Sequence, residues 1–326
     1  MYRYQELGLH NVTAMFEKAY QGGYAVPALN FVSIEQFNAI IDAAKENRSP
    51  VILLASPNLH RQLGAEILAR IAQAGADRLA HEGAGDVPLA LHLDHGMTYD
   101  QCVHAIETGF SSVMIDGSAL PFEENIALTR KVVDYAHAAG VTVEGELGVL
   151  TGAEEEGGEG HGLASQYTDP ALVQQFVQET GVDCLAISIG TSHGLVKMKP
   201  KADGTLPELR FDILEEVQRR LPGFPIVLHG SSSIPAKYVD MINQYGGHLE
   251  QTIGIPEEQV ARAAKMAVCK VNIASDGWIS ALALTRKILA ENPAAIDSRV
   301  FTLKVRPELA ELYAHKMRVL GSVNKA

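Results

Sequence analysis

The sequence predicts an α/β protein, a single (β/α)8 TIM barrel over residues 1–326 with an N-terminal helix and extra C-terminal helices. Short apolar runs alternate eight times with segments of helical period, which is the pattern of parallel strands joined by helices. No linker or break in composition divides the chain. A length of 326 residues with 47% hydrophobic residues is enough for one large barrel core.

The predicted strands are nearly continuous apolar runs bounded by Gly, Pro or polar residues, as expected for parallel strands buried on both faces. In chain order they are Tyr24–Asn30, Val51–Ala55, Leu89–Leu93, Ser112–Asp116, Val141–Leu147, Cys184–Gly190, Pro225–Gly230 and Val268–Ile273.

The predicted helices are segments with apolar residues three or four apart. They cover 11–22, about 37–44, 59–75, 99–108, 123–139, 170–180, 211–220, two pieces within 235–267, 276–291 and 306–320. The stretch from Gly148 to Gly162 is rich in Gly and Glu and is predicted to be a long mobile loop. Long loops in compact domains are often lids over a functional site.

Composition excludes several classes of function. The chain has 27 Lys and Arg against 39 Asp and Glu, a net charge of −12, which argues against a broad basic surface for nucleic acid. The cysteines Cys102, Cys184 and Cys269 form no CxxC pair, which favours reduced core residues in a cytosolic protein. No signal core or membrane-spanning run is apparent, so we expect a soluble cytoplasmic chain without a membrane partner.

Polar residues follow every predicted strand, where a barrel collects its catalytic groups. In strand order they are Asn30, Ser56, Asp94 with His95, Asp116, Glu146, His193, His229 and Asn272. Three of them are histidines, the usual number of protein ligands for a catalytic zinc with an open coordination position. The histidines are scattered in sequence, so the prediction depends on their common place at the strand ends.

Each residue also has an ordinary interpretation. His193 and His229 each precede a glycine and could simply cap strand ends. His92 alternates with Asp94 and is expected to be an inward core histidine, and Glu144 could be a structural partner. Asp116 and Glu146 are candidates for a second metal position or for orienting the imidazoles.

Turns rich in Gly and Ser follow two of the histidines, at Gly190–Gly194 and Gly230–Ser233. Their amides and hydroxyls suit a phosphate group, although ordinary turn chemistry needs the same residues. Asn272–Ser275 after the last strand strengthens the phosphate interpretation. The run Glu154–Glu156 is either a solvated face or, within the predicted lid, a source of proton transfer.

Seven ordered motifs give the chain a resemblance to class II, metal-dependent fructose-bisphosphate aldolases and the related tagatose-bisphosphate enzymes. They are Val26–Asn30, Leu93–Gly96, Ser111–Ser118, Val143–Gly148, Ile189–Gly194, Leu228–Ser233 and Lys270–Ile273. The insert containing Tyr245–His248 looks like the fructose-bisphosphate branch. In contrast, Ala274-Ser275-Asp276 stands where that branch usually has Asp-Thr-Asp, and Ala there is more like the tagatose branch.

The resemblance implies cofactors and residue roles. Zinc would bind His95, His193 and His229, with Asp116 and Glu146 near a second metal position, and a monovalent cation is a further expected cofactor. Asp94 would be the proton-transfer aspartate and Glu155, or Glu154, the lid acid or base. The residues implied to hold the dihydroxyacetone phosphate end are Gly194, Gly230, Ser232, Asn272 and Ser275, whereas Asn30 and Ser56 fall near the other end of the sugar.

The implied activity is reversible cleavage of a ketose 1,6-bisphosphate, foremost fructose 1,6-bisphosphate, by a homo-oligomer, a dimer or tetramer. A zinc ion stabilises the developing oxyanion in such chemistry. The alternatives are a Schiff-base aldolase using Lys270, a metal-dependent hydrolase, and a silent sugar-phosphate-binding protein. No arginine for the distal phosphate is evident, and Lys304 and Arg306 are weak substitutes.

Overall fold

The computed structural model describes residues 2–150 and 167–326, and its strands form a closed barrel of parallel neighbours in the order β1 to β8. The predicted TIM barrel is therefore confirmed. The strands are β1 (Val26–Asn30), β2 (Val51–Ala55), β3 (Leu89–Gly96), β4 (Ser112–Ile115), β5 (Thr142–Leu147), β6 (Cys184–Ile187), β7 (Ile226–Leu228) and β8 (Val268–Ile273).

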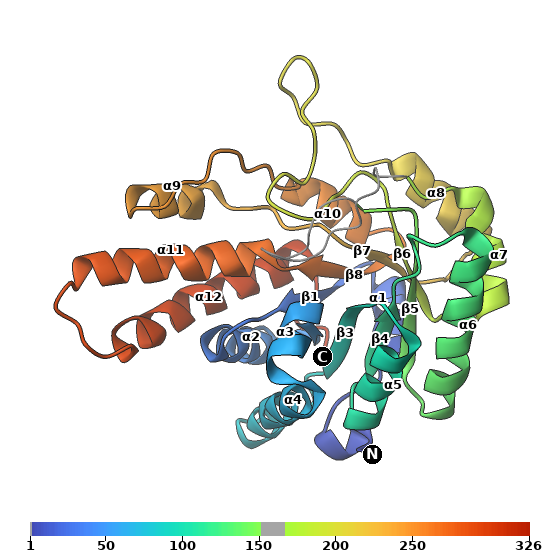
Figure 1. Cartoon of the computed structure of the whole chain (residues 1–326), viewed down its shortest axis with the longest axis horizontal. Coiled ribbons are helices and arrows are strands. Elements are labelled where there is room, and N and C mark those ends of the chain that lie inside the picture. Colours follow the sequence, from blue (N-terminus) through green and yellow to red (C-terminus); the bar gives the residue numbers. More distant parts are fainter. Residues whose placement is uncertain (1, 151–166) are drawn as a thin grey trace.

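Helices surround the barrel, with an additional helical pair extending to one side (Figure 1). The helices are η1 (Tyr4–Leu7), α1 (Val12–Gly22), α2 (Ile34–Asn47), α3 (Pro57–Leu63), α4 (Ala65–His81), α5 (Tyr99–Thr108), α6 (Phe122–Ala138), α7 (Pro170–Thr180), α8 (Phe211–Arg220), α9 (Ala236–Gln244), α10 (Glu257–Ala264), α11 (Ser275–Glu291) and α12 (Arg299–Val319).

Several predicted boundaries were wrong, among them that β6 ends at Ile187 rather than Gly190 and β7 at Leu228 rather than Gly230. The helix expected over 59–75 is two helices, because Gly64 has φ +82° and interrupts it between α3 and α4. The helix expected from residue 306 starts at Arg299 and continues through Pro307. The strand expected to end at Leu93 runs to Gly96, which carries it through the candidate site residues.

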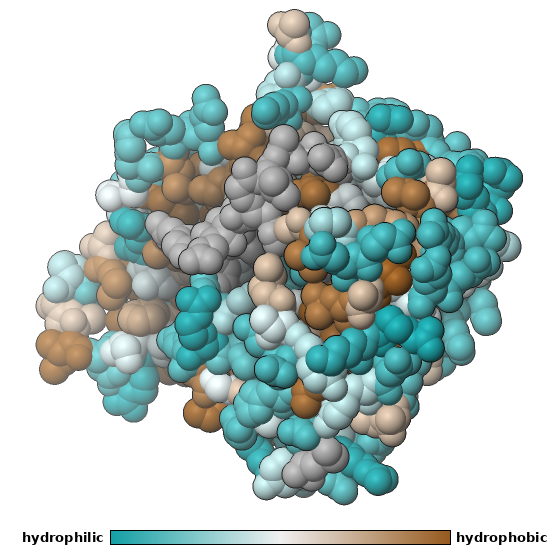
Figure 2. All heavy atoms as spheres, turned by 45° about the vertical axis from the view of Figure 1, so that its right-hand side comes forward, coloured by the Kyte–Doolittle hydropathy of each residue, from teal (hydrophilic) through white to brown (hydrophobic). Residues whose placement is uncertain are grey.

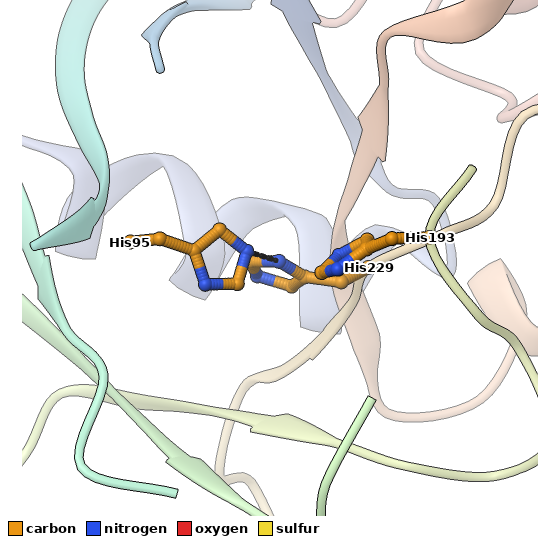
Figure 3. A group of neighbouring side chains, drawn as sticks. All are labelled: His95, His193 and His229. Carbon is orange, nitrogen blue, oxygen red and sulfur yellow. Dashed lines mark hydrogen bonds between the residues drawn. The ribbon is translucent and has the colours of Figure 1, made fainter. Parts of the chain in front are cut away.

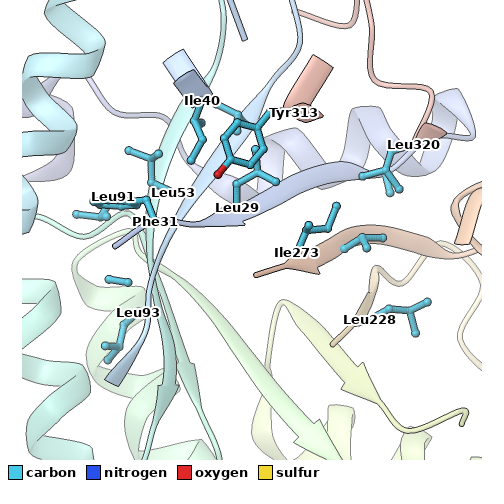
Figure 4. Packing of buried hydrophobic residues seen from close by; sticks show 14 of the residues in the cluster. Leu29, Phe31, Ile40, Leu53, Leu91, Leu93, Leu228, Ile273, Tyr313 and Leu320 are labelled. Atoms are coloured by element: carbon cyan, nitrogen blue, oxygen red, sulfur yellow. The ribbon is translucent and has the colours of Figure 1, made fainter. Parts of the chain in front are cut away.

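Side chains alternate between the inner and outer faces of each strand, so the strands separate two apolar clusters. Outward residues such as Leu29, Leu53 and Leu91 pack against the surrounding helices in one cluster, and Figure 4 shows part of it. Inward residues, including Ala28 and Ile52, form the second cluster with α1, which contributes its own buried face. The inward positions further along the strands are polar, so the site lies at the carboxyl ends.

The helices α11 and α12 lie side by side and extend from the barrel (Figure 1). α12 also packs on α2, where Arg306 Nε lies 2.6 Å from Asp42 Oδ2. Asp42 also accepts from Arg78 of α4. Arg306 and Arg78 therefore join α12, α2 and α4 through Asp42.

Most of the face drawn in Figure 2 is hydrophilic, with smaller hydrophobic areas between the charged side chains. Among the described residues, no helix is long and apolar enough to cross a membrane.

Candidate active site

The end of β3 places two adjacent polar side chains at the barrel rim. Four β3 residues, Leu93 to Gly96, lie opposite three β4 residues, Val113 to Ile115, so the strand bulges at Asp94 and His95. His95 has φ +47°, in the left-handed region that a non-glycine residue rarely adopts. Bulges of this kind change the direction of side chains next to active sites. Both Asp94 and His95 are buried.

Three imidazoles, one at the end of β3, one on the loop after β6 and one directly after β7, converge at this rim (Figure 3). The ring centroid of His95 lies 4.7 Å from that of His229 and 5.1 Å from that of His193. One ligand atom from each of the three histidines lies within 4.8 Å of the others. The structure therefore brings the three histidines that were predicted from scattered positions into one group.

Carboxylates set the tautomers of two of these rings. His95 Nδ1 lies 2.8 Å from Asp116 Oδ2, and His229 Nε2 lies 2.7 Å from Glu144 Oε1. Since ionised carboxylates only accept hydrogen bonds, each of those ring nitrogens carries its proton. The remaining nitrogens, His95 Nε2 and His229 Nδ1, then present lone pairs to each other across 3.0 Å.

Two facing lone pairs repel each other unless a cation lies against both. Nitrogens bound to one tetrahedral zinc at about 2.0–2.1 Å are themselves about 3.3 Å apart, close to the spacing here. Burial lowers the pKa of His193 well below its usual value and is also the largest influence lowering the pKa of His229. Both rings are therefore neutral, the form that binds metals. The residues present fit a divalent metal ion.

A second possible ligand group shares His95 with the first. His95, Asp116 and Glu146 also bring one ligand atom each within 4.8 Å of the others. Asp116 is held in place by Ser118, whose backbone N and Oγ donate to Asp116 Oδ1 at 3.0 and 2.6 Å. The Asp116 carboxylate therefore orients the His95 ring and also lies where it could contact a second ion.

The carboxylate of Asp94 is fully buried beside the histidines. Its Oδ1 accepts a hydrogen bond of 3.0 Å from Asn272 Nδ2, and its Oδ2 has no hydrogen-bond partner among the described residues. Burial favours a raised pKa, but nearby positive charge, including that of Lys270, lowers the pKa of Asp94 overall. Asp94 therefore offers a carboxylate with one oxygen open to a proton.

Comparison with known proteins agrees with this arrangement. The family model described as "Fructose-bisphosphate aldolase class-II" matches residues 10–325. The chain belongs to the class-II fructose-bisphosphate aldolase family. This is a family of carbon–carbon lyases that generally depend on a metal ion, and the histidine group is a possible place for that ion.

Individual relatives cover the whole chain. A fructose-bisphosphate aldolase of Treponema pallidum (strain Nichols) is 52% identical over 336 aligned residues, covering 100% of both chains. A fructose-bisphosphate aldolase of Giardia intestinalis is 39% identical and covers 96% of this chain and 93% of its own. The crystal structure of the YdjI aldolase from Escherichia coli K12 superposes with a TM-score of 0.73 at 28% identity, covering 98% of this chain and 99% of that one.

Beneath the rim, this class-II aldolase buries a second set of charged residues. Lys270 Nζ lies 2.7 Å from Glu144 Oε2 and 3.3 Å from His92 Nε2, and His92 Nδ1 lies 2.8 Å from Ser112 Oγ. The expectation of His92 as an inward core histidine is confirmed, because it is 1% exposed. Glu144 is the residue that links this layer to His229.

The predicted phosphate-binding positions lie on the turns after β6, β7 and β8. Gly230 has φ +63°, and a side chain there would bring its Cβ 2.5 Å from Ser192 O, so only glycine fits. Ser232 Oγ accepts from Ala274 N at 3.2 Å, which joins the β7 turn to the start of α11. Ser275 is the first residue of α11, where backbone N–H groups favour an anion.

The remaining predicted site residues are Asn30, Ser56, Gly194, Glu154 and Glu155. Asn30 ends β1, and its amide has no hydrogen-bond partner in the described part of the chain. Ser56 begins α3 and accepts from Leu59 N at 3.3 Å. Gly194 has φ +81° directly after His193. Glu154 and Glu155 lie outside the described residues.

Sequence reasoning missed Lys197. This lysine is 4% exposed, and its positive charge is one influence that lowers the pKa of His193. Its backbone pairs with Ile253, which holds the loop after β6 against a distant segment. A lysine three residues after the Gly-Thr-Ser-His-Gly turn was the signal available in the sequence.

Proposed function

We propose that the chain catalyses reversible aldol cleavage of fructose 1,6-bisphosphate to dihydroxyacetone phosphate and glyceraldehyde 3-phosphate, with zinc on His95, His193 and His229. The observation that carries this proposal is the meeting of three imidazoles with the buried carboxylate of Asp94 at one barrel rim. Family membership and the names of the relatives support the same reaction.

Asp94 is proposed to remove the proton from the C4 hydroxyl. As that O–H bond breaks, the C4 oxygen forms a carbonyl, the C3–C4 bond breaks, and its electron pair passes to the three-carbon half. When bound, the metal ion supplies Lewis-acid stabilisation for the oxygen that becomes negative in this half. Asn272 keeps Asp94 in place through its 3.0 Å hydrogen bond, leaving Oδ2 to accept the proton.

The three-carbon half must then take up a proton at the carbon that was C3. We assign this step to Glu155 or Glu154, both outside the described residues, from the family resemblance alone. Asp116 and Glu146 are proposed as the second metal position, and a monovalent cation is retained as a further cofactor.

The phosphate of the three-carbon half is proposed to bind the turns after β6, β7 and β8. The binding residues are Gly194, Gly230, Ser232, Asn272 and Ser275. Asn30 and Ser56 are proposed for the other end of the sugar.

The Schiff-base alternative is disfavoured by the surroundings of Lys270. A lysine that attacks a carbonyl must reach the substrate with a free amine. Lys270 is fully buried, and its Nζ is 2.7 Å from the Glu144 carboxylate. Its contacts are with the barrel interior, so it is a structural cation in this proposal.

Tagatose 1,6-bisphosphate is the second candidate substrate, and Ala274 is the observation that favours it. Ala274 is 9% exposed at the junction of β8 and α11 and offers no side-chain polar group to a substrate hydroxyl. Ala at this position is more like the tagatose branch of the family, and tagatose 1,6-bisphosphate is proposed as the second substrate for that reason.

A single preparation can test these proposals. Cleavage of fructose, tagatose and sedoheptulose bisphosphates is measured before and after chelation, with the bound metal identified by elemental analysis. We expect the highest kcat/KM for fructose 1,6-bisphosphate, loss of cleavage on chelation and recovery with zinc. Cleavage that persists after complete metal removal would contradict the proposal, and borohydride trapping of substrate on Lys270 would favour the Schiff-base route.

We also propose a cytoplasmic homo-oligomer, a dimer or tetramer. The free, buried state of Cys102, Cys184 and Cys269 supports a reducing compartment. Sedimentation of the purified chain would distinguish the two assemblies.

A further inference from the structure

A buried lysine outside the reacting groups connects the C-terminal helix to the turn after β7. Lys316 on α12 is 3% exposed. Its Nζ lies 2.6 Å from Asp276 Oδ2 and 2.6 Å from Glu257 Oε1, and it also donates to Ser233 Oγ. Burying a charge is costly unless it is paired, so Lys316 and the fully buried Asp276 depend on each other.

Asp276, which is fully buried, holds the backbone of the turn. Its Oδ1 accepts from Ile234 N at 2.6 Å and its Oδ2 accepts from Ser233 N at 3.1 Å. Ile234 has φ +49°, an unfavourable conformation for a β-branched residue. Such a conformation persists only where the surrounding structure stabilises it, and these two hydrogen bonds contribute to that stabilisation.

The other side of the same turn has little freedom to move. Ile255 N donates to Ser232 O at 3.0 Å, and Ala274 N donates to Ser232 Oγ at 3.2 Å. Gly254 approaches so closely that an added Cβ would lie 1.9 Å from Ser233 O. A shift at Ser233 or Ile234 must therefore move Ser232 as well.

We propose that Lys316 is a positioning residue that sets the affinity for the substrate phosphate by fixing Asp276 and, through it, the turn Ser231–Ile234. This inference rests on the proposed function, in which Gly230 and Ser232 bind the phosphate of the three-carbon half. Lys316 does not itself touch the substrate. A phosphate group keeps its contacts throughout the reaction, so a displaced turn weakens binding of substrate and transition state alike.

The main test is Lys316→Met, which keeps the length of the side chain and removes its charge. We expect KM for the bisphosphate and Kd for dihydroxyacetone phosphate to rise about tenfold, while kcat changes by less than about threefold. Metal content should match the wild-type enzyme. Lys316→Arg retains the cation and should recover most of the affinity.

Glu257→Gln provides a matched control on the same lysine. Glu257 contacts the side chains of Lys316, Ser233 and His315, and it borders a surface groove of about 420 Å³. No hydrogen bond links its carboxylate to the turn backbone in the described part of the chain. We expect KM and Kd within about twofold of wild type.

The outcomes separate this inference from the proposed function. Wild-type protein that neither cleaves the bisphosphate nor binds dihydroxyacetone phosphate would refute the proposed function. Active wild type with a folded Lys316→Met variant of unchanged KM, or with a fall in kcat alone, would overturn the inference. If Lys316→Met does not fold, the double variant with Asp276→Asn removes both buried charges, and the same rise in KM is expected from it.

Discussion

The rim histidines and the ion pair beneath them are both buried, but the histidine rings are neutral and the ion pair is charged. At the rim, burial leaves His193 and His229 neutral, and two ring lone pairs face each other. In the layer below, Lys270 and Glu144 form a fully buried ion pair at 2.7 Å. The charges of the lower layer are paired within the protein, whereas the rim nitrogens present lone pairs that suit a cation. This difference separates a scaffold from a binding site.

Removing a rim histidine should have the largest effect on activity. His193→Ala leaves two imidazoles, and we expect loss of most bound metal and a fall in cleavage of at least about a thousandfold. Metal analysis and a cleavage assay on the same sample measure both. His248→Ala, at an exposed histidine, is the control and should resemble wild type. Full metal content in His193→Ala would remove it from the proposed ligands.

Asp94→Asn tests whether the rim separates metal binding from proton transfer. The amide can still interact with Asn272 but cannot accept the C4 proton, so we expect kcat to fall about 10²- to 10⁴-fold. Bound metal should remain, since Asp94 is outside both ligand groups. Asp100→Asn, an exposed position on α5, serves as the control. An unchanged rate in Asp94→Asn would require a different base.

Lys270→Met tests the lower layer through stability. It leaves the Glu144 carboxylate buried without its cation, and we expect a loss of about 3–5 kcal/mol in the free energy of unfolding, measured with urea. The double variant with Glu144→Gln should recover much of this loss, because no isolated charge remains. A single variant as stable as wild type would show that the pair is dispensable.

The pH dependence of the free energy of unfolding tests the same layer through His92, with a smaller expected effect. Burial, and next the charge of Lys270, lowers the pKa of His92 to about 3 in the folded state. The unfolded chain therefore binds more protons between about pH 6.5 and 3, and the stability that His92 contributes is full above that range and lost as pH falls. We expect this residue to add a slope of up to about 1.4 kcal/mol per pH unit, which His92→Gln should lack. Parallel slopes for both proteins would contradict the assignment.

Local patterns were enough to predict the barrel and the grouping of three histidines at its rim. The period of two in each strand placed His92 inward, and the polar residues after each run predicted the rim, including His95, His193 and His229. Boundaries were less accurate where one residue's conformation decides them. Gly64 has φ +82° between α3 and α4, and α12 continues through Pro307.

The sequence by itself determined which residue types stand at the strand ends, because strand period and apolar runs are local properties. Only the tertiary structure decided how those residues meet. The 3.0 Å approach of His95 to His229 joins positions 134 residues apart, and it depends on the bulge in β3 and on closure of the barrel. The tautomers follow from Asp116 and Glu144, and the Lys316 cluster follows from the docking of α12. These contacts have no local signature in the sequence.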